Sequence, residues 1–402
     1  MEQWKEYKLG DICKTNISQY SAKENWDNAL YLDTGNITDN KINEIVTIND
    51  MTHGLPSRAR RKVKDKDILF STVRPNQRHI GILQNPQPNL LVSTGFTVIS
   101  ANQDVADPYF LYYFLSQKEI VDYLHAIAEQ AVSAYPSIKA SDIEDLDILL
   151  PELSQQKKIS ELLKSLDDKI ELNRQINDNL EQQAQALFKS WFVDFEPFKD
   201  GEFVDSELGM IPKGWRVGKL SDIADVTMGQ SPSGESYNEN GIGEIFYQGR
   251  TEFGDRFPSI RLYTTAPNRM AESNSILLSV RAPVGDINVA LQKCCIGRGL
   301  ASINAIDNYY SFVFYTVKSM KKDFGVYNGE GTVFGSINKD SLNNMSVIIP
   351  TDDIKSNFEN IVSKLDNEYR LNYNEIVNLS NLRDTLLPRL MSGELKINEI
   401  NC

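Results

Sequence analysis

The chain has 402 residues, of which 41% are hydrophobic and 24% charged, a balance that supports buried cores and excludes wholesale disorder. No apolar run reaches the ~18 residues of a membrane span, and the beginning of the chain lacks the apolar stretch of a signal peptide. The net charge of −13 argues against a protein that coats nucleic acid non-specifically, unless its basic groups are concentrated on one face.

Cysteine and histidine usage narrows the class of protein further. The four cysteines (Cys13, Cys294, Cys295 and Cys402) form no CxxC pair, so we expect no disulfide framework and a cytoplasmic location. The three histidines are scattered through the first half of the chain, which argues against a histidine-rich metal site.

Residues 1–150 predict a mixed α/β domain. Apolar runs at Ile68–Val73 and Leu90–Ser100 are typical of buried strands, and Asp107–Ala131 has the apolar spacing of a helix. Basic groups cluster at residues 58–66 and 74–78 of this domain; arginine, asparagine and glutamine can contact base edges, and lysine mostly neutralises phosphate. Its candidate DNA-binding residues are Arg58, Arg60, Arg61, Lys62, Lys64, Arg74, Asn76, Gln77 and Arg78.

Residues 151–198 predict one long helix. The segment Leu153–Phe192 contains no Gly or Pro, and its apolar residues recur every three or four positions for about five heptads, as in a coiled coil. Asn173 lies on this stripe, where it either pairs across a helix–helix seam and fixes the register, or faces solvent. Phe188, Trp191 and Phe192 exceed what one seam requires, so they either dock helices of a partner subunit or pack on the chain's own domain.

Residues 199–349 predict a second mixed domain, with strands at Ser275–Val280 and Ser346–Ile349, and residues 350–402 predict a second long helix. The apolar stripe of that helix carries Asn372 at the position that matches Asn173, and antiparallel pairing of the two helices predicts contact between these asparagines. For both basic clusters the alternative is an ordinary solvated charged face. The second domain's candidate DNA-binding residues are Gln230, Ser231, Arg250, Arg256, Arg261, Arg269, Arg281 and Arg298.

Four matches between the two halves occur in the same order, which chance does not explain. Trp4 recurs as Trp215, residues 68–71 recur as 276–279, residues 95–101 as 299–305, and residues 137–138 as 336–337. The offset falls stepwise from 211 to 199 residues, as expected if two copies share a framework and differ in loop length.

The repeat predicts an α+β fold in which two mixed α/β domains are separated by two long antiparallel coiled-coil helices, with pseudo-two-fold symmetry. A helix of about 38 residues is roughly 57 Å long, and B-DNA repeats every ~34–36 Å along its axis. Two DNA-facing domains on a stiff spacer therefore suit two different half-sites on one duplex.

Four segments resemble the specificity (S) subunit of type I restriction–modification systems: residues 166–173 (LDDKIELN), 191–198 (WFVDFEPF), 209–215 (GMIPKGW) and 386–395 (LLPRLMSGEL). The resemblance spans nearly the whole chain. It implies that residues 1–150 and 199–349 are target-recognition domains, and that the double-stranded DNA target is bipartite and asymmetric, with a non-specific spacer. It also implies assembly with two modification (methyltransferase) subunits and then with restriction (translocase and nuclease) subunits.

The same resemblance implies that S-adenosylmethionine, ATP and Mg²⁺ are used by those partners, and that this chain binds no cofactor. Because the family's recognition domains vary freely, no base-contacting residue is carried over. The candidate DNA-binding residues rest on charge and side-chain type alone.

The sequence contains no complete catalytic motif of the kinds considered, which supports a non-enzymatic role. Adenine methylation needs an (N/D)-P-P-(Y/F) turn, and the nearest string, Asp107–Phe110 (DPYF), lacks the second proline and is better explained as a helix start. Asp352–Lys355 (DDIK) also suits a helix start, and Cys294 and Cys295 suit a buried strand. We expect a DNA-recognising scaffold. The alternatives are a self-sufficient DNA-modifying enzyme and a coiled-coil adaptor whose domains bind proteins.

Overall fold

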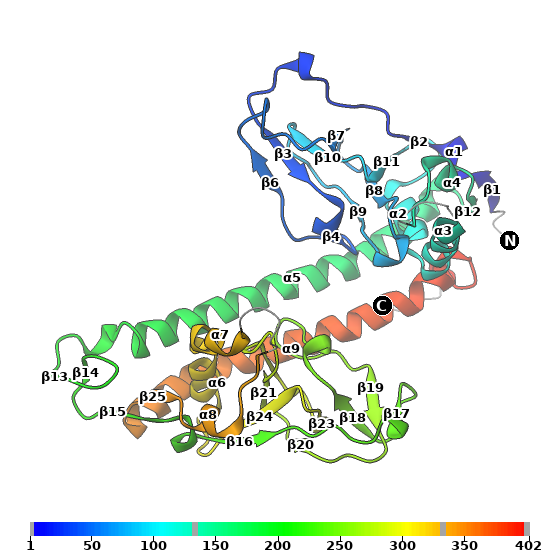
Figure 1. Ribbon diagram of the computed structural model, residues 1–402. Helices are drawn as coiled ribbons and strands as arrows, with labels where there is room; N and C mark the ends of the chain where they lie inside the picture. The colour runs from blue at the N-terminus through cyan, green and yellow to red at the C-terminus, as the bar shows by residue number, and fades with distance from the viewer. Residues whose placement is uncertain (1–3, 131–135, 330–334, 398–402) are drawn as a thin grey trace. The chain divides into compact units, whose positions relative to one another are not determined.

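The computed structural model describes residues 4–130, 136–329 and 335–397, so Cys402 and Ala131 lie outside the described residues. The chain divides into two compact units. The first unit comprises Met1–Asn173 and Glu375–Cys402, and the second comprises Arg174–Asn374. Each unit therefore contains one globular domain and about half of each of two long helices (Figure 1).

The globular domain of the first unit contains two four-stranded sheets. One has the strand order β6-β3-β10-β7 and the other β2-β11-β8-β9. The strands are β1 (Lys5–Lys8), β2 (Cys13–Thr15), β3 (Ala29–Leu32), β4 (Ile37–Thr38), β5 (Lys41–Ile42), β6 (Val46–Ile48), β7 (Ala59–Lys62), β8 (Ile68–Ser71), β9 (Ile80–Ile82), β10 (Leu90–Ser93), β11 (Phe96–Ala101) and β12 (Asp147–Leu150). The helices are α1 (Leu9–Ile12), α2 (Pro108–Ser116), α3 (Lys118–Gln130) and α4 (Ala140–Glu144), with 3₁₀ turns η1 (Ala22–Glu24), η2 (Thr34–Asn36) and η3 (Pro75–Gln77).

The second unit has a four-stranded sheet in the order β16-β24-β21-β22 and a five-stranded sheet in the order β17-β19-β18-β23-β20. Its strands are β13 (Phe203–Val204), β14 (Ile211–Pro212), β15 (Arg216–Lys219), β16 (Ala224–Met228), β17 (Tyr237–Asn238), β18 (Glu244–Tyr247), β19 (Leu262–Thr264), β20 (Met270–Ala271), β21 (Ile276–Ser279), β22 (Ile287–Val289), β23 (Cys294–Ile296), β24 (Leu300–Ala305) and β25 (Ser346–Ile349). Its shorter helices are α6 (Tyr310–Ser319), α7 (Lys321–Gly325) and α8 (Lys339–Asn343), with 3₁₀ turns η4 (Glu196–Phe198), η5 (Leu220–Asp222), η6 (Gly234–Ser236), η7 (Arg250–Glu252) and η8 (Val326–Asn328).

The two units repeat one topology. The order β2-β11-β8-β9 corresponds to β16-β24-β21-β22, and the pair β1-β12 corresponds to β15-β25. The registers agree as well: Ala101 faces Cys13 in the first unit, and Ala305 faces Ala224 in the second. In both units one parallel strand pair, β3 with β10 and β18 with β23, lies in an otherwise antiparallel sheet. The predicted α+β fold with an internal repeat is confirmed.

The long helices are α5 (Leu153–Phe192) and α9 (Asp352–Met391), each of 40 residues. In the first unit Asp167 of α5 pairs with Arg383 of α9 at 2.8 Å, while Lys169 pairs with Glu375 at 3.4 Å. In the second unit Asn177 donates to the Tyr369 carbonyl at 3.2 Å. Numbers rise along α5 as they fall along α9, so within each unit the two helix segments run antiparallel. Among the described residues, no helix combines the length and apolarity needed to cross a membrane.

Both asparagines of the predicted seam are buried, and each donates its side-chain amide to a partner within its own unit. Asn173 donates from Nδ2 to Glu375 Oε2 at 2.7 Å, whereas Asn372 donates to Asn177 Oδ1 at 3.1 Å. The pattern missed Asn177 because it placed Ile176 on the seam, and Ile176 is 37% exposed. A shift of one residue on a helix rotates a side chain by about 100°, enough to leave the seam.

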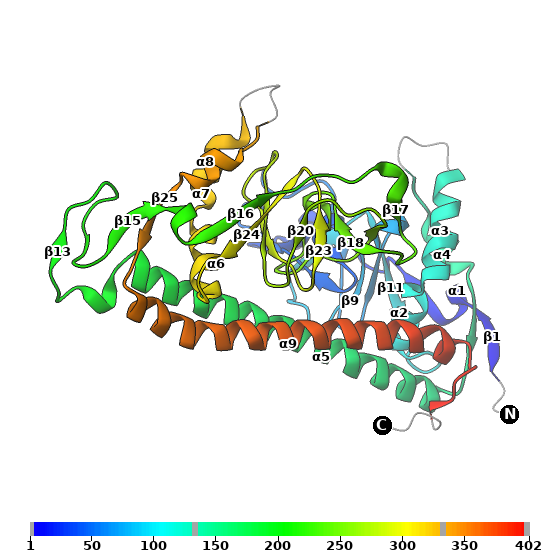
Figure 2. The ribbon, with the colours of Figure 1, turned by 90° about the horizontal axis from the view of Figure 1, so that it is seen from below.

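Aromatic residues at the end of α5 belong to the core of the second unit, which corrects their prediction as a subunit interface. Phe188 and Phe192 are buried, and their rings lie 6.4 and 5.1 Å from the ring of Phe312 on α6. The Trp191 ring is partly buried, 6.0 Å from that of Phe358 on α9. Figure 2 shows α6 beside the second-unit segments of α5 and α9. Phe188, Phe192, Phe312 and Phe358 of these helices belong to one buried hydrophobic cluster. The alternative of packing on the chain's own domain is therefore confirmed.

Two predicted elements are each divided in the structure. The run Leu90–Ser100 forms β10 and β11, which join different sheets and are separated by a turn at Thr94 and Gly95. The helix predicted at Asp107–Ala131 is broken at Gln117, whose extended backbone (φ −60°, ψ 141°) separates α2 from α3. Both interruptions lack Pro at the break, so apolar spacing alone did not reveal them.

Candidate nucleic-acid interface

One corner of the first unit brings together polar side chains from four separate segments. The parallel strands β3 and β10 end side by side at Asp33 and Ser93, and the turn after β10 exposes Thr94. Strand β7 borders β10 and brings Arg61 opposite Val92, and Gln19 forms a bridge with Arg61. We call Gln19, Asp33, Arg61 and Thr94 the first turn cluster.

Hydrogen bonds fix the side chains of the first turn cluster. Arg61 Nη2 donates to the Thr94 carbonyl at 3.3 Å, and burial lowers the pKa of this guanidinium. Burial opposes ionisation of Asp33, but donation by the Thr34 N–H at 2.9 Å and by the Ser93 hydroxyl outweighs burial and holds the Asp33 pKa below its ordinary value. Asp33 is therefore a carboxylate at neutral pH, and its oxygens accept hydrogen bonds.

The second unit builds the same corner from the equivalent segments. Strands β18 and β23 end side by side, so Gln248 follows Tyr247 and Arg298 lies in the turn after β23. Ile296 donates to the Arg269 carbonyl at 2.9 Å, and Gln230 donates to the Ile296 carbonyl at 3.0 Å. We call Gln230, Gln248, Arg269 and Arg298 the second turn cluster. All four residues are exposed.

Strand register makes the two clusters equivalent position by position. Val92 lies between Leu32 and Arg61, just as Ile296 lies between Tyr247 and Arg269. It follows that Asp33 corresponds to Gln248, Arg61 to Arg269 and Thr94 to Arg298. Gln19 is related to Gln230 by the same sequence offset as Cys13 to Ala224, although Gln19 pairs with Arg61 of β7 and Gln230 bonds to Ile296 of β23.

Glycines allow the second turn cluster to be this compact. A Cβ on Gly297 would meet the Gln248 carbonyl oxygen at 2.7 Å, and a Cβ on Gly229 would meet the Gly297 oxygen at 2.2 Å. The backbones that carry Gln230, Gln248 and Arg298 therefore approach more closely than any side chain permits. The Arg298 N–H is held in addition by the Ser231 hydroxyl at 3.2 Å.

The predicted DNA-binding residues of the first domain fall into two groups. Arg58, Arg60, Arg61 and Lys62 lie on or next to β7, beside the first turn cluster, with Lys64 two residues beyond this strand. Several of these side chains also have partners in the protein: Lys62 pairs with Glu24, and Arg60 Nε donates to the Ser57 carbonyl at 3.3 Å. Several side chains of this basic strand are therefore engaged within the protein.

The other group lies on the turn between β8 and β9. Arg74 N–H donates to the Pro136 carbonyl at 3.0 Å, and Asn76 and Gln77 are exposed on η3. Arg78 is half-buried, pairing with Asp39 at 2.6 Å and donating to the Ser116 carbonyl at 3.0 Å. The Arg78 side chain is therefore engaged within the domain, and its partners do not belong to the first turn cluster.

In the second domain some of the candidate arginines are ion-paired and others, within the described ranges, are not. Arg269, Arg281 and Arg298 are exposed, and among the described residues they form no ion pair closer than 4 Å. Arg281 follows β21, next to Val280, whose N–H donates to the Gly299 carbonyl. By contrast Arg250 pairs with Asp286, and Arg261 pairs with Glu252 at 2.6 Å and with Glu239 at 3.4 Å.

Arg256 is not a DNA contact, which corrects its prediction. It is only 8% exposed, and its guanidinium pairs with Glu181 of α5 at 3.0 Å and Asp366 of α9 at 2.6 Å. The same group lies 4.5 Å from the Phe314 ring centroid. Sequence shows the charge of an arginine but not the carboxylates that neutralise it from distant helices.

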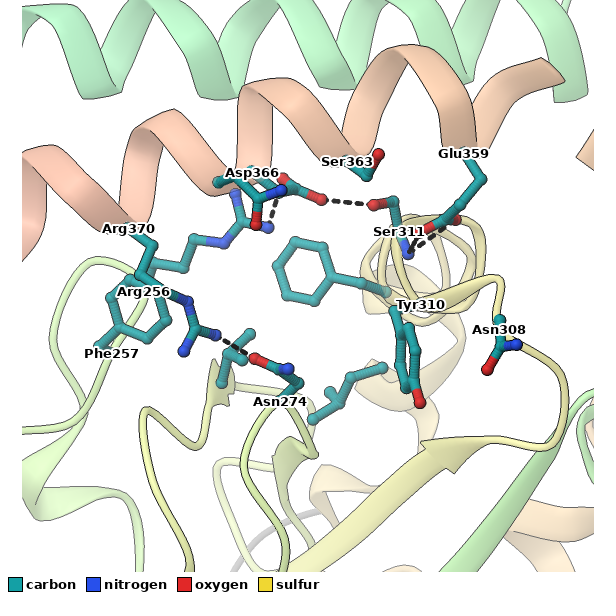
Figure 3. A pocket seen from close by; sticks show the side chains of 14 residues that line it. Arg256, Phe257, Asn274, Asn308, Tyr310, Ser311, Glu359, Ser363, Asp366 and Arg370 are labelled. Carbon is teal, nitrogen blue, oxygen red and sulfur yellow. Dashed lines mark hydrogen bonds and ion pairs between the residues drawn. The ribbon is translucent and has the colours of Figure 1, made fainter. Parts of the chain in front are cut away.

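A pocket of about 360 Å³ lies beside this buried network (Figure 3). Figure 3 shows Arg256 against Asp366 of α9, with Glu359 and Ser311 at the opposite end of the pocket. Glu359 accepts hydrogen bonds from the N–H groups of Ser311 and Phe312, at the start of α6, which has no side-chain cap of its own. The polar groups of the pocket thus hold α6 on α9 within the second unit.

The structure supports the helix-start and strand interpretations of the enzyme-like strings. Asp107 caps α2 by accepting from the Phe110 N–H at 3.0 Å, and Asp352 begins α9 and pairs with Lys355 at 2.8 Å. Cys294 and Cys295 are buried in β23, and burial raises the pKa of Cys294 to about 12. Within the described ranges, no group of three His, Cys, Asp or Glu residues is arranged to hold a metal.

Gln19, Asp33, Thr94 and Gln248 are not among the residues predicted from sequence, because none of them lies in a basic run. The repeat itself contained the signal for one, because Gln19 and Gln230 differ by the same 211 residues as Trp4 and Trp215. The other three become visible only when strand register shows which positions are equivalent.

Comparison with known proteins identifies the family. The model for the type I restriction modification DNA specificity domain matches residues 1–182 and 212–380. A putative type I restriction enzyme specificity subunit, MjaX, from Methanocaldococcus jannaschii is 32% identical over 413 residues, covering 98% of this chain and 94% of the relative. The HindI specificity subunit of Haemophilus influenzae is 29% identical over 468 residues, covering 98% of this chain and 100% of the relative.

A solved structure shares the fold. The S subunit of a type I restriction–modification system from M. genitalium has a TM-score of 0.58 and 17% sequence identity, covering 96% of each chain. Family match, near full-length identity and duplicated topology agree with the resemblance of the four sequence segments. The chain belongs to the type I restriction modification DNA specificity family.

Proposed function

We propose that this chain is the DNA specificity subunit of a type I restriction–modification enzyme, and that it recognises a bipartite, asymmetric target in double-stranded DNA. Residues 1–150 and 199–349 are the target-recognition domains, and residues 151–198 and 350–402 are the helical spacers. The chain selects the sequence, and partner subunits carry out catalysis.

The observation that carries this function is the pair of turn clusters. Each unit presents polar side chains at the same place in a repeated fold, all four exposed in the second unit and Asp33 and Arg61 partly buried in the first, yet the residues differ between the two units. Glutamine, arginine and carboxylate side chains are those that hydrogen-bond to base edges in the major groove. Two equivalent but chemically different surfaces suit two different half-sites, because equal surfaces would select a symmetric target.

Partner subunits have candidate docking surfaces on the long helices. Leu172 of α5 and Leu371 of α9 are 51% and 62% exposed, and Leu382 is 46% exposed. Exposed apolar surface marks a protein interface where it is contiguous, and an assembled partner helix would join these leucines into such a surface. We infer that two modification subunits bind these helices and that restriction subunits join afterwards. S-adenosylmethionine, ATP and Mg²⁺ would be held by those partners.

We further propose that the enzyme acts in the cytoplasm. Cys13, Cys294 and Cys295 are buried as free thiols, and proteins of oxidising compartments use cysteine mainly in disulfides.

Methyl transfer by the reconstituted complex tests the function. The chain would be mixed with its modification subunits, labelled S-adenosylmethionine and a duplex library, and methylated sites would be sequenced. We expect methylation only with both components present, at one bipartite motif. Methyl transfer by the chain alone would favour a self-sufficient enzyme. Failure of the complex to bind duplex DNA in a sequence-selective, salt-dependent way would favour a protein-binding adaptor.

A further inference from the structure

The two turn clusters differ in the hydrogen bonds they can offer to a base pair. The first contains a glutamine, a carboxylate, a hydroxyl and an arginine whose Nη2 is already bonded to the Thr94 carbonyl. The second contains two glutamines and two arginines, all exposed. The first cluster therefore offers a carboxylate that only accepts, an amide and a hydroxyl that both donate and accept, and a guanidinium that is partly engaged. The second cluster offers two forked guanidinium donors and two amides.

We propose that these four equivalent positions in each unit determine base specificity, and that Arg298 and Arg269 read guanine in the half-site of the second unit. This proposal rests on the proposed function and names the residues behind it. Arginine makes a bidentate contact with guanine O6 and N7, and glutamine makes one with adenine N6 and N7. Asp33, an acceptor, selects an amino group, as cytosine N4 provides, in the other half-site.

Arg298 is held in a geometry suited to base reading. It lies between Gly297 and Gly299, whose Cβ positions would meet the Gln248 carbonyl at 2.7 and 3.0 Å. Its own N–H is fixed by the Ser231 hydroxyl at 3.2 Å. The backbone at this turn is packed, while the side chain is exposed, so a short ordered segment presents one long cationic group. Rigid support of this kind preserves the geometry that a bidentate contact requires.

Three other arginines of the domain have carboxylate partners, which Arg269 and Arg298 lack within the described ranges; Arg281 is also exposed but is not part of the second turn cluster. Arg250, Arg256 and Arg261 are each neutralised by a carboxylate of the protein. A guanidinium that contacts a base must leave any carboxylate partner, and such a partner also repels the nearby phosphates. Among the described residues, no carboxylate lies within ion-pair distance of Arg269 or Arg298. Arg250 thus provides a matched control, because it is an exposed arginine of the same domain with a carboxylate partner.

Methylation sequencing of variants in the assembled complex tests the proposal. The full chain carrying Arg298→Ala, Arg269→Ala or Arg250→Ala would be assembled with the modification subunits and given a randomised duplex library. We expect Arg298→Ala and Arg269→Ala each to relax one guanine position in a single half-site, reducing discrimination there about ten- to hundredfold. The other half-site and the spacer should be unchanged, and Arg250→Ala should keep the wild-type motif.

Two further variants keep the test decisive. Thr94→Arg, which places in the first cluster the residue found at Arg298, should alter only the other half-site. Arg298→Lys should retain methylation but lose guanine discrimination, because lysine lacks the planar fork. An unchanged motif for Arg298→Ala and Arg269→Ala, or an equal loss at every sequence, would overturn the proposal. A wild-type complex without a bipartite motif would instead refute the proposed function.

Discussion

The buried cation Arg256 offers a quantitative test of how the second unit is held together. Its guanidinium joins three elements, because it pairs with Glu181 of α5 and Asp366 of α9 while being carried by a loop of the globular domain. Lys318 of α6 also pairs with Glu181, and the Tyr315 hydroxyl lies 3.3 Å from both carboxylates. Burial opposes the charge on Arg256, but Asp366, Tyr315 and Glu181 outweigh it and raise the Arg256 pKa.

The change Arg256→Ala should destabilise the second unit strongly. Removing one partner of a buried ion pair typically costs 3–5 kcal/mol, because the remaining charge stays buried without compensation. Lys318 still pairs with Glu181 in this variant, so Asp366 is the carboxylate that stays buried without a cationic partner. The contact of the guanidinium with the Phe314 ring, 4.5 Å away, is lost as well. We therefore expect a loss of about 3–5 kcal/mol in the free energy of unfolding of this unit.

Hydrogen exchange followed by mass spectrometry resolves the two units. Amides of α6 should exchange about a hundredfold faster or more in Arg256→Ala, since each 1.4 kcal/mol corresponds to a factor of ten. Amides of α2 in the first unit should keep their protection. The control Arg250→Ala breaks a largely solvent-exposed pair and should change protection by less than tenfold, because surface ion pairs contribute about 0–1 kcal/mol.

Two results would refute this reasoning. One is equal protection in Arg256→Ala and Arg250→Ala, which would mean that the buried network contributes no more than a surface pair. The other concerns a triple variant, Arg256→Met with Glu181→Gln and Asp366→Asn, which removes all three charges together. It should recover much of the lost stability, because no carboxylate or guanidinium of the network is left buried without a partner, and Lys318, which loses Glu181, is partly exposed to solvent. A triple variant less stable than Arg256→Ala would show that packing and not charge explains the loss.

Burial opposes ionisation of Glu181, but Arg256 and Lys318 outweigh it and hold the Glu181 pKa below its ordinary value. The ionised Glu181 therefore stabilises the fold above pH ~4.5, and this stabilisation is lost as the pH falls through the lowered pKa. Glu181→Gln should therefore flatten the fall in melting temperature between pH 6 and pH 3. The single change Asn372→Leu should cost about 1–3 kcal/mol in urea unfolding by leaving the buried Asn177 amide oxygen unpaired, and the double change with Asn177→Leu should cost less; equal costs would argue against the pair. Leu371→Glu should weaken assembly with modification subunits at least tenfold in analytical ultracentrifugation while the melting temperature stays unchanged, and Leu149→Glu, at an exposed strand position, should leave assembly intact. An insertion of about one helical turn after Leu180, with a matching insertion in α9, should change the spacer accepted between half-sites, and an unchanged spacer would contradict the role given to the helices.

The sequence predicted those features that depend on periodicity and repetition. The long helix α5 begins at Leu153 and ends at Phe192, where the uninterrupted stripe begins and ends, because a coiled-coil pattern needs no tertiary information. The repeat offsets predicted the correspondence of Ile68–Ser71 with Ile276–Ser279, and both segments form central strands of equivalent sheets. Side-chain type singled out Gln230, Arg269 and Arg298, which the structure places together.

What failed depends on contacts between distant segments. Arg256 looks like any other arginine until Glu181 and Asp366 approach it from two helices. Phe188 and Phe192 looked like surplus for a seam, because the sequence does not show that α6 packs there. Asp33 and Gln248 carry no signal of their own, and only the parallel pairing of β3 with β10 and of β18 with β23 makes them equivalent. Register and partner choice are tertiary properties, so local pattern did not reveal them.

The most direct test is the DNA motif methylated by the complete wild-type complex, read by single-molecule sequencing of a genome or a randomised library. Two units with different turn clusters predict two unlike half-sites, separated by a fixed number of unspecified base pairs, with guanine required in the half-site assigned to the second unit. A continuous motif, a palindromic motif, or methylation that does not depend on this chain would contradict recognition by two unlike domains.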